Sequence, residues 1–260
     1  MRTPIEYAET FCAVLLRDLY VTGRDMWNFL GQVLLQPLFM LLIFGEVIIR
    51  LGFATEEYGD LLFPGMVALT AVLTGVQGTG MPLSIDFAAF REIEDRLLSP
   101  LPLSLVALEK VIFGVVRSMI AAIAVFPIGI LVLGSVPFDS GSLPLLISIL
   151  LLGAFLGSTI GLALGTLVPP NQVNFVFAVL MPPLLFTGCS QYPWPMLDQI
   201  RWLQVVSLFN PLTYVSEGVR AALLNDVPHL PPSLCLAMLV GAVVLFSVIG
   251  IYGFRRQALG

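Results

Sequence analysis

Long apolar stretches, broken by short polar ones, dominate the chain. Five runs contain no Asp, Glu, Lys or Arg, and the fourth is long enough to cross a bilayer twice, since one crossing needs about 20 residues. The runs are residues 26–45, 61–85, 118–138, 140–197 and 227–254. The pattern predicts an all-α membrane protein with six membrane-spanning helices, at residues 27–49, 61–85, 105–133, 143–168, 173–187 and 233–254.

Turn signals and an amphipathic pattern define two further features. The sequence Pro169-Pro170-Asn171-Gln172 cannot continue a helix and divides the fourth run in two. Near the N-terminus, Thr3, Pro4 and Glu6 form a helix start with a capping box, and apolar residues then recur at helical spacing among charged ones. Residues 3–22 are therefore predicted to form an amphipathic helix in the membrane interface, with a core-packing helix as the alternative.

Residues 188–228 are too polar for a free span and too apolar for a loop in water. They carry Arg201, an Asn210-Pro211 pair, Glu217 and Arg220 among apolar residues. Charged or irregular chain is tolerated at membrane depth only where other protein shields it. We therefore expect a pair of short helices that re-enter the membrane from outside, with Glu217 and Arg220 one turn apart and able to pair.

Composition and charge add the environment and the orientation. The chain is 58% hydrophobic and 11% charged, which excludes a water-soluble domain, and its net charge of −5 argues against a nucleic-acid partner. Cations gather at one side of the predicted spans, which orients both termini to the cytoplasm and fits an even number of crossings. That side holds Arg2, Arg17, Arg24, Arg91, Arg96, Lys110, Arg255 and Arg256, and the other holds Arg50, Arg201 and Arg220.

Two spans carry polar stripes at helical spacing. The first stripe consists of Asn28, Gln32 and Gln36, and the second of Thr70, Thr74 and Gln77. Such stripes either line a substrate path or form hydrogen bonds between neighbouring helices, and the sequence leaves both open.

A stripe of glycines marks the predicted span at 143–168. Gly153, Gly157, Gly161 and Gly165 lie four residues apart and repeat the G-x-x-x-G pattern three times. This pattern predicts close helix–helix packing, against a partner in this chain or in a second copy.

Few ionisable residues fall within the spans. Glu46 and Arg50 stand four apart in the favourable order and are predicted to form a local ion pair. Arg117 lies seven residues beyond Lys110, close enough to the cytoplasmic surface to snorkel towards it. With no further buried acids expected, a chain of proton carriers is absent, which argues against an ion-coupled secondary transporter, the alternative function.

The chain contains few residues that could carry out catalysis. The single lysine, Lys110, follows no glycine-rich phosphate loop, so ATP is not bound in that way. The single histidine, His229, and the scattered cysteines supply neither a Ser-His-Asp arrangement nor a metal-ligand cluster. We expect a non-enzymatic chain without a cofactor of its own.

A charged island separates the second and third spans. Six charges fall between Asp86 and Arg96, and Ser99-Pro100-Leu101-Pro102 ends the segment. The island is predicted to be a short helix, and Phe87 and Phe90 on one face favour docking into a partner over a solvated connector.

Two blocks of the sequence match a known pattern: one runs from Glu94 to Leu101 (EDRLLSPL) and continues over residues 105–110, and the other is NPLTY at 210–214 with Arg220. With these blocks the chain resembles the ABC-2 type permeases, the membrane subunits of a class of ATP-binding-cassette exporters. QPLF at 36–39 and LLIFG at 41–45 are similar to the drug- and lipid-exporting branch.

This resemblance implies the fold and partners of a type V ABC exporter. It implies a homodimer of this chain, joined to two copies of a separate ATPase subunit that binds ATP and Mg, in the inner membrane of a prokaryote. It further implies export of a drug, a lipid or a lipid-linked glycan, without fixing which. The whole chain, 1–260, would form a single transmembrane domain.

The resemblance also assigns roles to particular segments. It implies that residues 86–98 form a coupling helix that docks on the ATPase, with 188–228 as the re-entrant outer segment. The docking residues would be Phe87, Phe90, Arg91, Glu94, Arg96 and Leu97. The residues closing the outer side would be Asn210, Pro211, Tyr214, Glu217 and Arg220, and those lining the path Asn28, Gln32, Gln36, Thr70, Thr74 and Gln77.

Overall fold

The structure, a computed structural model, describes residues 4–55, 57–85, 102–138, 140–224 and 226–259. Every regular element of these residues is a helix. The α-helices are α1 (Pro4–Arg24), α2 (Met26–Leu42), α3 (Ile48–Arg50), α4 (Glu57–Ile85), α6 (Leu103–Leu133), α7 (Leu143–Leu167), α8 (Val173–Thr187), α9 (Arg201–Ser207), α10 (Pro211–Leu223) and α11 (Pro232–Leu259). A π-helical turn, η1 (Ile43–Val47), joins α2 to α3, and 3-10 turns occur at η3 (Ser140–Ser142) and η4 (Trp194–Gln199).

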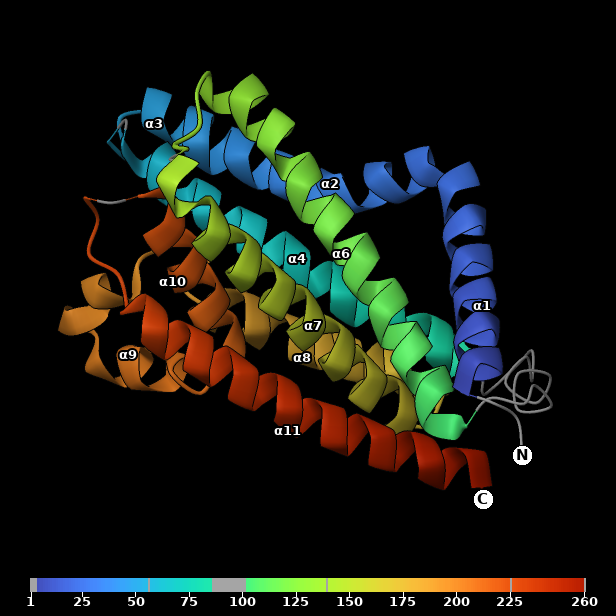
Figure 1. The fold of residues 1–260 in the computed structure, drawn as a ribbon. Coiled ribbons are helices and arrows are strands. Elements are labelled where there is room, and N and C mark those ends of the chain that lie inside the picture. Colours follow the sequence, from blue (N-terminus) through green and yellow to red (C-terminus); the bar gives the residue numbers. More distant parts are fainter. Residues whose placement is uncertain (1–3, 56, 86–101, 139, 225, 260) are drawn as a thin grey trace.

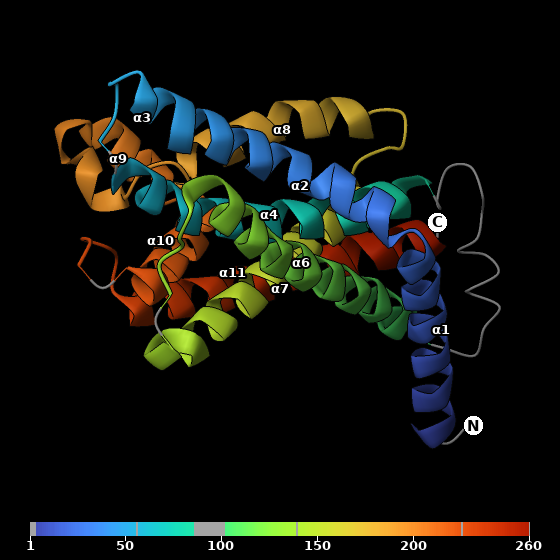
Figure 2. The ribbon, with the colours of Figure 1, turned by 90° about the horizontal axis from the view of Figure 1, so that it is seen from above.

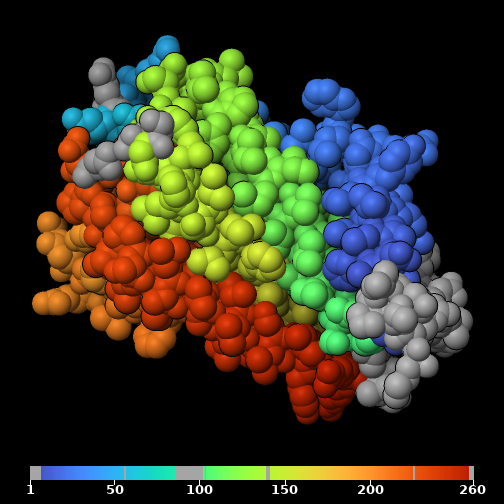
Figure 3. All heavy atoms as spheres, in the orientation of Figure 1, coloured from blue at the N-terminus to red at the C-terminus, as the bar shows by residue number. Residues whose placement is uncertain are grey.

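Helix α4 is the centre of the molecule. It packs against α6, α7 and α10, and in Figure 2 it lies between α8 on one side and α6 and α7 on the other. Helix α1 stands roughly perpendicular to α2 at one end of the bundle, and the C-terminal end of α11 lies at that same end, while η4, α9 and α10 lie at the opposite end (Figure 1). The side chains of α6, α7 and α11 make up much of the face seen in Figure 3.

The described residues include five helices that are long and apolar enough to cross a membrane. These comprise the α2–α3 segment, α4, α6, α7 and α11. The predicted span at 173–187 is the 15-residue helix α8, which continues through Pro182 and Pro183 to Thr187. At 1.5 Å per residue it is about 22 Å long, shorter than a hydrocarbon core of about 30 Å.

The helices extend beyond several predicted boundaries. Helix α4 begins at Glu57, four residues before the predicted span, and the carboxylates of Glu57 and Asp60 in its first turn interact favourably with the positive end of the helix dipole. Helix α1 continues through Gly23 to Arg24, and α11 continues past Arg256 to Leu259. The predicted turn at Pro169–Gln172 is confirmed between α7 and α8, where the Gln172 N–H donates to the Pro169 carbonyl oxygen at 2.9 Å.

The glycine stripe of α7 packs on α4 of the same chain. A Cβ added at Gly157 would lie 2.3 Å from the Val72 carbonyl oxygen, and one at Gly161 would lie 2.6 Å from that of Val76. At these positions the two backbones meet directly, whereas Gly153 of the stripe faces Val215 of α10. The predicted close packing is confirmed, and the partner helix, which the sequence left open, lies within the chain.

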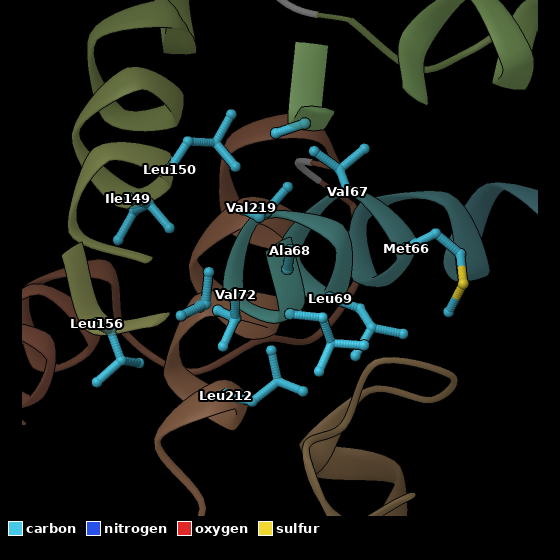
Figure 4. Close-up of a cluster of buried hydrophobic side chains, with 14 of the residues drawn as sticks. Met66, Val67, Ala68, Leu69, Val72, Ile149, Leu150, Leu156, Leu212 and Val219 are labelled. Carbon is cyan, nitrogen blue, oxygen red and sulfur yellow. The ribbon is translucent and has the colours of Figure 1, made fainter. Parts of the chain in front are cut away.

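The main hydrophobic core is built where α4, α7 and α10 meet. Val67, Ala68 and Val72 of α4 are fully buried there. Figure 4 shows these side chains with Ile149 and Leu150 of α7 and with Leu212 and Val219 of α10. Helix α10 is therefore a core element, although its sequence is less apolar than that of the long spans.

Candidate functional site

A small polar pocket lies between α2 and α4. Five of the six predicted path residues line it, together with Val33, Pro37, Leu69 and Leu73, and its volume is about 50 Å³. The five are Gln32, Gln36, Thr70, Thr74 and Gln77. The sixth, Asn28, lies outside the pocket, and its amide donates to the Asp25 carboxylate.

The amides and hydroxyls of this pocket are satisfied to different degrees. Thr70 is buried and donates to the Met66 carbonyl oxygen at 2.8 Å, so its hydroxyl has a partner within α4. Gln32, Gln36 and Gln77 are exposed and form no hydrogen bond with a described residue. Because unsatisfied amides are costly in hydrocarbon, this face requires water, a ligand or another protein surface against it.

The outer-segment residues converge on the two ends of α10. Asn210 caps the helix: its Oδ1 accepts from the Leu212 N–H at 3.0 Å, and its Nδ2 donates to the Leu184 carbonyl oxygen at 2.8 Å and to Thr187 Oγ1 at 2.9 Å. Pro211 occupies the first helical turn, where its missing N–H is harmless. One asparagine thus joins the start of α10 to the end of α8.

Glu217 and Arg220 form a fully buried ion pair at the other end of α10. Both have no exposed surface, and the predicted pairing is confirmed. Glu217 accepts from the Trp194 N–H at 3.0 Å and the Leu230 N–H at 3.1 Å. Arg220 donates to the Cys189 carbonyl oxygen at 3.1 Å. The pair therefore ties α10 to three backbone segments, those around residues 189, 194 and 230.

Further contacts reinforce this outer cluster. The Tyr214 hydroxyl donates to the Leu208 carbonyl oxygen at 2.8 Å, and the Trp194 indole N–H donates to that of Gln204 at 3.0 Å. Burial raises the pKa of the Cys189 thiol to about 11, so this cysteine stays neutral at pH 7 and is a poor nucleophile. These contacts hold the chain segments around α10 together.

Two other charged contacts lie elsewhere on the chain. The predicted Glu46–Arg50 ion pair is confirmed across the π-helical turn. An ion pair that the sequence did not reveal joins Lys110 Nζ to Asp18 Oδ2 at 3.3 Å and fastens α1 to α6. The two residues are 92 positions apart, and no spacing rule connects them.

The expectation of no further buried acids is wrong. Glu109 and Glu217 have exposed fractions of 1% and 0%. Each lies beside a cation: Glu109 Oε2 is 4.0 Å from Lys110 Nζ, and Glu217 pairs with Arg220. Charged residues are rarely buried unless paired, and here a cation within one turn of the same helix accompanies each acid.

Arg117 makes a contact that its sequence neighbours do not indicate. Its guanidinium carbon lies 4.4 Å from the centre of the Phe29 ring on α2 and 5.6 Å from that of Phe113. The predicted docking residues Phe87, Phe90, Arg91, Glu94, Arg96 and Leu97 lie outside the described residues.

Comparison with known proteins gives the family. Residues 9–224 match the ABC-2 type transporter family. The putative transport permease ycf38 of Porphyra purpurea is 26% identical over 232 residues, which cover 84% of this chain and 78% of the relative. The inner membrane transport permease YadH of Escherichia coli K12 is 29% identical over 213 residues, covering 80% of this chain and 78% of the relative. The chain therefore belongs to the ABC-2 type transporter family and is a membrane-embedded permease of an ABC transporter.

Proposed function

We propose that this permease exports a hydrophobic or amphiphilic substrate, such as a drug, a lipid or a lipid-linked glycan, with energy from ATP hydrolysed by a separate ATPase subunit. The observation that carries the proposal is the polar pocket on α2 and α4, the one place where predicted path residues from two spans meet at a common surface. A purely structural contact would satisfy the exposed amides of Gln32, Gln36 and Gln77 within the chain, and no described residue does so.

The assembly that follows contains two copies of this chain and two ATPase subunits. ATP and Mg would be bound by the ATPase, and this chain would bind neither. We propose six crossings, of which α8 is the short one in addition to the five long helices. Both termini would lie at the cytoplasmic face of a prokaryotic inner membrane. The position of α1 and the end of α11 at one end of the bundle agrees with an even number of crossings.

The substrate path would run between the two copies. Helices α2, α4 and α8 of each copy would face it, so that a second copy covers the polar face of the first. Closure of the ATPase pair would open this path alternately to the two sides. The outer cluster around α10 would close the external side and move as a unit, because the Glu217–Arg220 pair fixes it to its neighbouring segments.

An ion-coupled mechanism finds no support among the described residues. Both fully buried acids lie beside cations, and they sit on different helices, α6 and α10. A proton relay needs neighbouring carriers that change charge during the cycle.

The docking of the ATPase can be tested at the predicted coupling helix. In a Phe87→Asp/Phe90→Asp variant, we expect loss of copurification with the proposed ATPase subunit, since two charges would enter an apolar pocket of the partner. A Phe53→Asp variant is the matched control, because Phe53 is 80% exposed and follows α3, outside the predicted coupling helix. Undiminished association of the double variant would remove residues 86–98 as the docking segment.

A further inference from the structure

Arg117 is a cation within α6, one of the helices long and apolar enough to cross a membrane. It is half-buried near the centre of α6, and it forms no ion pair or hydrogen bond with any described residue. Its Nε atom is buried and has no acceptor. An unpaired charge at this depth is expensive, and intramembrane arginines normally pair or serve a ligand.

The surroundings of Arg117 fix the guanidinium and leave its donors free. Phe29 stacks on the group at 4.4 Å, and Phe113 lies 5.6 Å away, so cation–π contacts hold the guanidinium in place without using its N–H groups. The planar fork that remains matches the geometry of a carboxylate or phosphate, which it binds bidentately.

Arg117 lies beside the polar pocket, although it is not one of the residues that line it. Phe29 precedes Gln32 by one helical turn on α2, and Gly78 directly follows Gln77 on α4. The Arg117 Nη1 atom is 3.9 Å from the position that a Cβ on Gly78 would occupy. The cation therefore lies next to the pocket, about one helical turn beyond Gln32 on the α2 side.

The size and lining of the pocket indicate what this surface binds. A volume of about 50 Å³ is that of a head group rather than of a whole drug or lipid. The exposed side chains of Leu35 and Phe39, on the same helix, offer an apolar track outside the pocket. A ligand with a small charged head and an apolar tail would satisfy both.

We propose that Arg117, together with the amides of the pocket, binds the carboxylate or phosphate head group of an anionic amphiphile whose tail lies along α2. This inference deepens the proposed function, on which it rests, by naming the substrate class. It assigns Arg117 the recognition of charge, and Gln32 and Gln77 the additional hydrogen bonds to the head group.

The test compares two ligands that differ only in the head group. Binding of oleate and of oleyl alcohol is measured by native mass spectrometry on the permease purified with its ATPase in neutral detergent. For Arg117→Gln, we expect the oleate dissociation constant to rise by about tenfold or more, as for loss of a charge-assisted bidentate contact, and that of oleyl alcohol to stay within about twofold. Arg117→Lys keeps the charge without the fork and should lie between the native protein and Arg117→Gln.

Two further variants separate this site from non-specific attraction. Arg24→Gln removes the same charge from an exposed position at the end of α1 and should leave oleate binding within about twofold of native, since exposed charges are screened. Gln32→Trp fills the pocket with Arg117 intact and should weaken oleate binding, whereas an arginine that merely anchors the helix to the membrane surface would be insensitive to it.

Each outcome bears on the proposal. Native oleate affinity in a folded Arg117→Gln protein, checked by circular dichroism, overturns it; if that variant does not fold, native affinity in Gln32→Trp does so. Displacement of oleate by equimolar inorganic phosphate would show that the site binds free anions, and it would overturn the proposal of an amphiphilic ligand. Binding is measured without turnover, so a chain that binds oleate through Arg117 yet shows no ATP-dependent transport would refute the proposed function and leave the binding site standing.

Discussion

Two arginines in this permease differ in how their charge is accommodated. Arg220 is fully buried, paired with Glu217 and bonded to the Cys189 carbonyl oxygen. Arg117 is half-buried, and its guanidinium lies over the rings of Phe29 and Phe113. Both arginines have a buried Nε atom without an acceptor, but only Arg220 has a counter-ion among the described residues.

This contrast distinguishes a region that is held rigid, around α10, from a region that is available for binding, at the polar pocket. Around α10, one ion pair and one asparagine connect segments that are far apart in sequence, so the outer region is held as a unit. At the pocket, by contrast, exposed amides form no hydrogen bond with described residues. Substitutions at the first region should therefore change stability, and substitutions at the second should change binding.

The largest effect is expected from Arg220→Gln. Removing one partner leaves Glu217 buried without a cation, which lowers the free energy of unfolding by about 3–5 kcal/mol. Thermal unfolding of the purified protein in detergent measures the loss. The Glu217→Gln/Arg220→Gln double variant should recover part of it, since no uncompensated charge remains; a double variant as unstable as the sum of two single variants would refute coupling between the two residues.

A smaller loss is expected where α4 and α7 touch. Gly161→Ala would place a Cβ 2.6 Å from the Val76 carbonyl oxygen and force the helices apart, lowering the free energy of unfolding by about 1–3 kcal/mol. Gly241→Ala on α11 is the matched control: its Cβ would meet nothing within 4 Å, and the change should stabilise the helix by up to about 1 kcal/mol. Equal effects of the two substitutions in thermal unfolding would contradict the close packing of α4 on α7.

Asn210→Ala should lower the free energy of unfolding by about 1–2 kcal/mol, through loss of the cap of α10 and of its bonds to α8. Asn171→Ala, in the exposed turn between α7 and α8, should fall within about 0.5 kcal/mol of the native protein. The comparison uses the same thermal unfolding assay. Equal free energies of unfolding for the two variants would show that the cap of α10 does not contribute to stability.

The smallest effect on stability is expected from Arg117→Gln. Because no ion pair or hydrogen bond with a described residue is lost, the free energy of unfolding should stay within about 1 kcal/mol of native, or rise as an unpaired charge is removed. Measured beside Arg220→Gln, this substitution compares the same chemical change in the two settings. Similar losses of stability at both positions would abolish the distinction between them.

The sequence predicted the elements far better than the contacts between them. Charge-free runs located the long helices, and the spacing of Glu217 and Arg220 gave their pairing, because both signals are local. The partners Trp194 and Leu230 contribute backbone N–H groups to Glu217, which leave no signature in side-chain identity.

The same limit applies to contacts between distant segments. The glycine stripe predicted close packing without naming α4 as the partner, and the ion pair of Lys110 with Asp18 depends on where the bundle places α1. The stacking of Arg117 on Phe29 likewise requires α2 and α6 to be neighbours, which periodicity within either helix does not specify.

The most direct test of the account is reconstitution of the permease with its ATPase in liposomes, followed by transport of a fluorescent phospholipid with an anionic head group. The account predicts movement that requires ATP and Mg, persists after ion gradients are collapsed, and is lost in the Phe87→Asp/Phe90→Asp variant. Transport driven by an ion gradient in the absence of ATP would contradict it.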